Sequence, residues 1–145
     1  MTAPQSVCNY AMLRFLPHPE TGEFVNVGVI ANCLQPCFLH FLGEQKMPGR
    51  VKALFPDENE KAFETGMAAI EKEMKRVAAM IRDPKDCQIS FNEVVRPRES
   101  LFRFGEVRTI SISDPLNLAE ELFKRYVRME AMSQSTAREK AATAP

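Results

Sequence analysis

The chain has 145 residues, 45% of them hydrophobic, which is enough for one apolar core and short for two. Its 19 basic and 19 acidic residues cancel, which disfavours nucleic acid as a partner without excluding it. We find no signal peptide and no apolar run long enough to cross a bilayer, so we expect a cytoplasmic protein that does not bind membranes.

The first third of the chain predicts three strands. Residues 7–16 are rich in apolar and aromatic side chains and end at a proline, which is typical of a strand. Proline and glycine in residues 17–22 predict a turn, so a second strand over 23–34 should return antiparallel to the first. Residues 37–42 follow a further proline and complete a three-stranded meander.

The stretch from Gly22 to Ala31 is the least ordinary in the chain. Its three alternating valines, at positions 25, 27 and 29, should share one buried face, with Asn26 on the other. Gly28 indicates a bulge or a close approach of another backbone. Asn26 has two open interpretations: a functional side chain, or one that only bonds neighbouring backbone.

The four cysteines, at positions 8, 33, 37 and 87, are expected to be reduced thiols. Cys33, Cys37 and His40 lie close in sequence but lack a second clear pair of metal ligands, so we expect structural cysteines and no metal. No motif in the chain calls for a cofactor.

The middle of the chain changes to helical periodicity. Residues 46–55 predict a short helical turn, and Asp57 is placed to cap a long helix over 58–82. Its apolar stripe should cover the domain's own sheet, although a coiled-coil seam for a partner is the alternative. The stripe consists of Phe63, Met67, Ile70, Met74, Val77 and Ile81.

The last third predicts a loop at 83–86, a short helix at 88–95, and a strand or hairpin over 101–113 with Gly105 at its turn. Asp114 should cap a closing helix. We therefore expect a flexible N-terminus at 1–6, one domain at 7–131 and a disordered tail at 132–145. The predicted fold is α+β: a short antiparallel sheet packed against one long helix and a C-terminal helix.

Polar residues at the end of the first hairpin form the candidate binding site. Arg14 lies near the end of strand one, whereas Glu23 and Asn26 lie near the start of strand two, so these three should form a cluster on the open sheet face. Arg98 should lie close enough to extend it. A carboxylate paired with arginine keeps a low pKa and is a poor general base, which favours recognition over catalysis.

Two classes of function fit these residues. The first is a binding or regulatory protein that engages a protein partner and needs no catalytic group. The second is a small enzyme or nucleic-acid-processing protein, with Glu23 as acid or base and Asn26 orienting the substrate. Its phosphate or carboxylate would be bound by the arginines at positions 96, 98, 103 and 108. We find no nucleophilic catalytic set, so the residues favour the first class.

The hairpin also carries a family resemblance, in the residues Tyr10-x-x-Leu13-Arg14-Phe15-x-Pro17 and Gly22-Glu23-Phe24-x-Asn26-Val27-Gly28-Val29. This signature resembles the bacterial family catalogued as domain of unknown function 3037, which has no established activity. The resemblance implies a gene neighbourhood beside kinases similar to HipA, the kinase half of a toxin–antitoxin pair. It therefore implies a protein partner of that kind, and it leaves the oligomeric state undefined.

Overall fold

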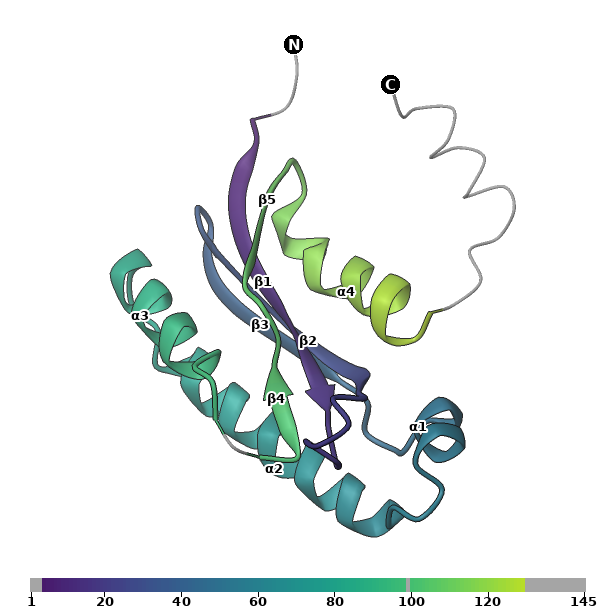
Figure 1. The fold of residues 1–145 in the computed structure, drawn as a ribbon. Coiled ribbons are helices and arrows are strands. Elements are labelled where there is room, and N and C mark those ends of the chain that lie inside the picture. Colours follow the sequence, from purple (N-terminus) through teal and green to yellow (C-terminus); the bar gives the residue numbers. More distant parts are fainter. Residues whose placement is uncertain (1–3, 99, 130–145) are drawn as a thin grey trace, which may run out of the picture.

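A five-stranded antiparallel sheet forms the centre of the molecule (Figure 1). The structure is a computed structural model, and it describes residues 4–98 and 100–129. The central strand β1 (Ser6–Phe15) pairs with β2 (Val25–Leu34), and β2 pairs with β3 (Cys37–Gly43). On its other edge, β1 pairs with β4 (Phe102–Phe104) and β5 (Arg108–Ile112). The predicted meander is confirmed, except that β2 begins two residues later than expected.

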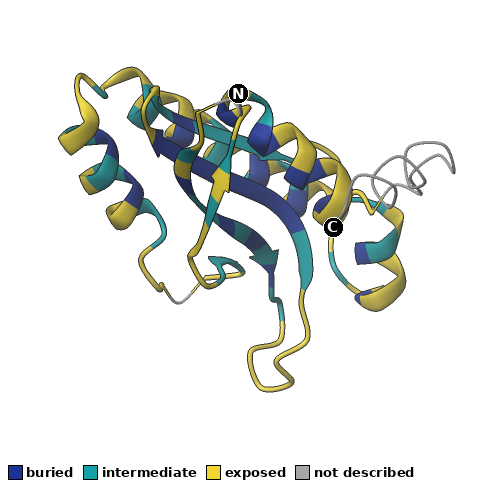
Figure 2. Cartoon of the chain, turned by 90° about the horizontal axis from the view of Figure 1, so that it is seen from above, coloured by how far each residue is buried: buried dark blue, intermediate teal, exposed yellow. Residues whose placement is uncertain are grey.

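Helices cover both faces of this sheet (Figure 1). One face packs against α1 (Gly49–Leu54), α2 (Glu60–Ala79) and α3 (Pro84–Val94). The other packs against α4 (Leu118–Leu122), which a 3-10 turn precedes and a π-helical turn, Phe123–Val127, follows. The α+β class is confirmed. Most of the buried strand residues lie in β1 and β2, between the two helix layers (Figure 2), whereas β5 is largely exposed.

A bulge in β2 changes which face its valines occupy. Leu13 lies opposite Gly28 but Arg14 lies opposite Asn26, so Val27 is an extra residue. Beyond this residue the alternation reverses: Val27 packs beside α1 and α2, whereas Val29 packs under α4. Both are buried as expected, but the prediction that the three valines share one face is wrong for Val29.

The last two strands are one interrupted strand and not a hairpin. Both β4 and β5 run antiparallel along β1, with Leu13 opposite Phe104 and Tyr10 opposite Arg108. Residues 105–107 therefore lie opposite only 11–12, which is a second bulge. The backbone N–H of Gly105 donates to the Met12 carbonyl at 2.8 Å, so the bulge stays attached to β1.

The helix boundaries differ from the prediction because the cap of α2 was assigned to the wrong residue and the cap of α3 was not recognised. Asn59, not Asp57, caps α2, since its side chain accepts the Ala62 N–H at 2.9 Å. Asp83 accepts the Asp86 N–H at 2.8 Å and caps α3, so the predicted loop at 83–86 is the first turn of a helix. The predicted helix at 88–95 is the remainder of α3.

The apolar stripe of α2 packs on the domain's own sheet, as expected. Phe63, Met67 and Met74 are buried, and Ile70 is half-buried between two of the apolar clusters on that face. The stripe is therefore engaged within the domain, which disfavours the coiled-coil alternative.

The cysteines lie toward one end of the sheet. Cys8 lies directly opposite Cys33, and both are buried under α4. Burial raises the pKa of the Cys8 thiol to about 12, helped by the neighbouring Cys33 thiol, and burial also raises the pKa of Cys87. Across residues 4–98 and 100–129, no three His, Cys, Asp or Glu side chains are placed to hold a metal ion.

The ends of the chain are only partly described. The predicted flexible N-terminus covers residues 1–6, of which 1–3 lie outside the described residues, whereas Ser6 already belongs to β1. The predicted disordered tail at 132–145 lies wholly outside them. No described helix is long and apolar enough to cross a bilayer.

We expect Ile70→Ala to lower the free energy of unfolding by about 2 kcal/mol, the low end for such a truncation, because Ile70 is only half-buried. Urea unfolding followed by circular dichroism measures this change. Lys72→Ala is the matched control, because Lys72 is exposed on the same helix and should change little. Equal stability of both variants and the wild type would contradict this packing.

We expect the free energy of unfolding to fall as the pH rises from about 9 to about 12. The unfolded Cys8 thiol ionises near its ordinary pKa of 9.0, whereas the folded one keeps its proton until about 12. Denaturant titrations across this window should show a smaller fall for Cys8→Ala than for the wild type. An identical pH dependence would show that the thiol is not protected.

Candidate functional site

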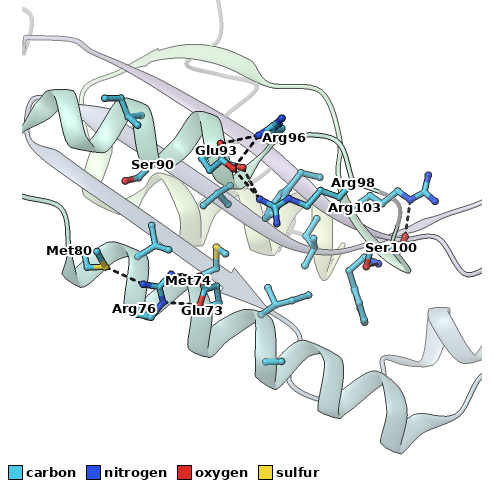
Figure 3. A pocket seen from close by; sticks show the side chains of 18 residues that line it. Glu73, Met74, Arg76, Met80, Ser90, Glu93, Arg96, Arg98, Ser100 and Arg103 are labelled. Atoms are coloured by element: carbon cyan, nitrogen blue, oxygen red, sulfur yellow. Dashed lines mark hydrogen bonds and ion pairs between the residues drawn. The ribbon is translucent and has the colours of Figure 1, made fainter.

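A cleft of about 570 Å³ lies between α2, α3 and residues 96–98 and 100–104 (Figure 3). Its apolar lining comes from the sheet and from both helices. The main apolar residues are Leu13, Ile70, Met74, Val77, Phe102 and Phe104. The size falls within the range of ligand-binding pockets, and it also suits a few anchoring side chains of a protein.

Two large apolar side chains stand exposed in the lining of this cleft. Met80, just beyond α2, is 62% exposed, and Ile89 on α3 is 57% exposed. Single exposed apolar residues are common on protein surfaces, but two beside an apolar cleft extend its surface outward. The cleft therefore offers a continuous apolar contact area.

Four arginines surround this apolar surface and meet only two glutamates among its lining residues. On α2, Arg76 donates through Nε to Glu73 at 2.9 Å, and across the cleft Arg96 and Arg98 share Glu93 at 3.4 and 3.5 Å. The hydrogen bond from Arg76 lowers the pKa of Glu73, and the charges of Arg76 and Arg98 lower it further. Four positive charges against two negative ones leave a net positive rim.

The predicted partners Arg14 and Asn26 do come together, as opposite residues on β1 and β2. Their sheet face is not open, because the α4 segment covers it and the Asn26 side chain donates to the Tyr126 carbonyl at 3.5 Å. Arg50 donates to the Asn26 backbone carbonyl at 3.0 Å. The side-chain oxygen of Asn26 is enclosed and has no hydrogen-bond partner in the described part of the chain.

The guanidinium of Arg14 lies between an aromatic ring and a glycine. Its Cζ is 4.2 Å from the centre of the Phe24 ring, a cation–π contact. A Cβ at Gly105 would lie 2.6 Å from the same Cζ, so any other residue there would require the guanidinium to move. Arg14 Nε is enclosed without a hydrogen-bond partner, and no acidic residue among 4–98 and 100–129 pairs with Arg14.

Glu23 and Arg98 do not join this pair. Glu23 is exposed, and no ion pair joins its carboxylate to Arg14 in the described structure. Gly22 adopts a left-handed φ of 74°, and after this turn it is Phe24 that covers Arg14. Arg98 pairs with Glu93 and lines the cleft on the opposite sheet face.

Sequence reasoning missed the two contacts of Arg14 and most of the cleft. Phe24 and Gly105 were visible only as a strand residue and a turn residue. The pairs Glu73 with Arg76 and Glu93 with Arg96 have the spacing of three that joins side chains on one helix face, which is a detectable signal. No spacing in the sequence indicates that these two pairs flank one cleft.

Comparison with known proteins gives one family. Residues 10–127 match the family described as "Protein of unknown function (DUF3037)", which covers most of the chain and confirms the resemblance seen in the hairpin. No curated protein and no solved structure matches the chain.

We expect Gly105→Ala to move the Arg14 guanidinium off the Phe24 ring, because the added Cβ would lie 2.6 Å from Arg14 Cζ. The guanidinium is the end of a flexible side chain, so the free energy of unfolding should fall by at most about 1 kcal/mol, the size of the lost cation–π contact. NMR shifts of the Arg14 Nε–H and Phe24 ring signals measure the displacement, and Gly49→Ala is the control, since a Cβ there meets nothing within 4 Å. Unchanged Arg14 and Phe24 signals in Gly105→Ala would overturn the arrangement around Arg14.

Proposed function

The chain belongs to the family of unknown function DUF3037, and we propose that it is a binding protein whose cleft between α2 and α3 seats an acidic segment of a protein partner. The observation that carries this proposal is an apolar cleft with Met80 and Ile89 exposed and four arginines against two glutamates around it. An occupant needs apolar side chains for the cleft and carboxylates for its rim.

The physical chemistry of interfaces supports a protein occupant. Binding surfaces combine apolar anchors with arginine and methionine, and both are present in this cleft. An amphipathic helix that docks in a groove places apolar residues on one face, with charged residues beside them. Carboxylates on that helix would meet the net positive charge left by Arg76, Arg96, Arg98 and Arg103.

The partner in this proposal is a kinase similar to HipA, met in the cytoplasm, which the family resemblance implies through gene neighbourhood. The protein would then act as an accessory or regulatory subunit of the kinase. It would do so without a catalytic group of its own.

The alternative, an enzyme or nucleic-acid-processing protein, has weaker support. It needs Glu23 and Asn26 to act together with the arginines of residues 96–108. Asn26 lies on the sheet face covered by α4, whereas Arg96 and Arg98 line the cleft on the other face. A single site that combines Asn26 with Arg96 and Arg98 would require the sheet to rearrange.

We expect Ile89→Asp and Arg98→Glu each to weaken binding of the co-expressed kinase by about tenfold or more, because each removes an anchor or reverses a rim charge. Co-purification followed by a titration of the purified proteins measures the affinity. Leu116→Asp is the matched control for the apolar change, because Leu116 is 65% exposed outside the cleft.

Arg108→Glu is the matched control for the charge reversal at Arg98, because Arg108 lies outside the cleft lining. Both controls should bind within about twofold of the wild type, a change close to the noise of such titrations. Losses as large as those of the cleft variants would place the interface elsewhere, and a kinase that never co-purifies would overturn the proposed partner.

A further inference from the structure

Three polar side chains form a row across the sheet, outside the cleft between α2 and α3. Asn9 on β1 lies directly opposite Asn32 on β2 and, on its other side, opposite Thr109 on β5. Opposite residues share one sheet face, with Cβ atoms about 5 Å apart. This face is the one that α3 packs against, because the Asn32 side chain contacts Cys87 of α3. Two side-chain amides therefore lie next to each other on the α3 side of the sheet.

Each of these two amides uses one end and leaves the other unpaired. Asn9 Oδ1 accepts a hydrogen bond from the Thr109 hydroxyl at 2.8 Å, and Asn32 Nδ2 donates to Cys87 Sγ at 3.7 Å. Asn32 is fully buried, and its Oδ1 has no hydrogen-bond partner among residues 4–98 and 100–129. Asn9 Nδ2 forms no hydrogen bond with the described residues. One acceptor and one donor are therefore left on neighbouring side chains.

Both amides line a cavity of about 520 Å³, which lies between the start of β1, the end of β2 and Pro84 at the start of α3. Its apolar surface includes two well-exposed side chains, Val7 at 61% and Leu34 at 39%. None of the lining residues is charged. The remaining lining residues are Gln5, Ser6, Cys33 and Gln35.

We propose that this cavity binds a neutral small molecule through a planar amide group, in which an N–H lies next to a C=O. The N–H of the ligand donates to Asn32 Oδ1, and its C=O accepts from Asn9 Nδ2. A buried acceptor without a partner is unfavourable, so a ligand that supplies the donor gains affinity from this atom. The apolar faces of the ligand lie against Val7 and Leu34, as in pockets that combine an apolar lining with a few placed polar groups.

The charges near the cavity disfavour an anionic ligand. The lining holds no lysine or arginine, and the N-terminus of α3 is already capped by Asp83, which accepts the Asp86 N–H at 2.8 Å. An anion would therefore lose its hydration without meeting a positive side chain. The cavity shares no lining residue with the cleft between α2 and α3, so this site does not depend on the proposed function.

The test titrates the full chain with uracil and, separately, with benzamide, and it follows the side-chain Nδ2–H signals of Asn9 and Asn32 by NMR. We expect both signals to shift with at least one of the probes. Uracil presents a cyclic amide and benzamide an open carboxamide, so the tighter probe identifies the kind of amide that the site takes. The comparators 1,3-dimethyluracil and benzoate lack the N–H, and each should bind about tenfold more weakly than its parent probe.

Two variants test the roles of the side chains. Asn9→Asp keeps the size of the side chain but replaces the donor with an acceptor, so it should weaken binding by about tenfold or more. Thr109→Val keeps the shape but removes the hydroxyl that holds Asn9 Oδ1, so it should weaken binding to a smaller extent. Asn9 is only half-buried and Thr109 is exposed, so both variants should fold, whereas a change at the buried Asn32 is not required.

Asn92→Asp is the matched control, because it makes the same change on α3 outside the lining of the cavity. Its affinity for the probe should stay within about twofold of the wild type. An equal loss for this control would overturn the site in favour of a general effect of added negative charge. The absence of any shift with both probes would also overturn it, as would a comparator that binds as tightly as its parent probe.

Discussion

The fold depends on one strand that is buried on both faces and paired along both edges. Alternate residues of β1 pack into different layers: Cys8, Tyr10 and Met12 lie under α4, whereas Ala11 and Leu13 face α2 and α3. Antiparallel sheets often leave one face to water, but helices cover both faces of this sheet around β1 and β2. A one-residue shift in the pairing of β1 would therefore exchange the residues of the two cores, which fixes its register strongly.

The two bulges flank β1 near Arg14. The first adds Val27 to β2, and the second adds a residue at 105–107 between β4 and β5. Bulges interrupt a ladder and re-aim side chains, and they are frequent beside functional sites. Here the first bulge lies beside Arg14 in the β1–β2 pair, and the second places Gly105 next to the Arg14 guanidinium. Both backbone irregularities therefore lie beside this side chain.

Local signals in the sequence predicted most of the fold but little of the site. Alternation and proline punctuation predicted the meander, and helical periodicity predicted the stripe of α2. Gly28 indicated a bulge or a close backbone approach, but the reversal of the alternation after Val27 was not predicted, because one extra residue leaves no trace in an alternating valine run. The sequence also carries no local signal that β4 and β5 both pair with β1. Arg98 was misplaced because sequence proximity to β4 does not reveal which sheet face a loop residue will reach.

The contact between Gly105 and Arg14 also constrains how this chain can diverge. A guanidinium at position 14 and a Cβ at position 105 would occupy the same space, although the two positions are far apart in sequence. A larger residue at 105 therefore requires either a shorter side chain at 14 or an arginine that turns away from Phe24, so the cation–π contact is lost in both cases. Relatives that lack the glycine should accordingly place less constraint on the aromatic residue at position 24.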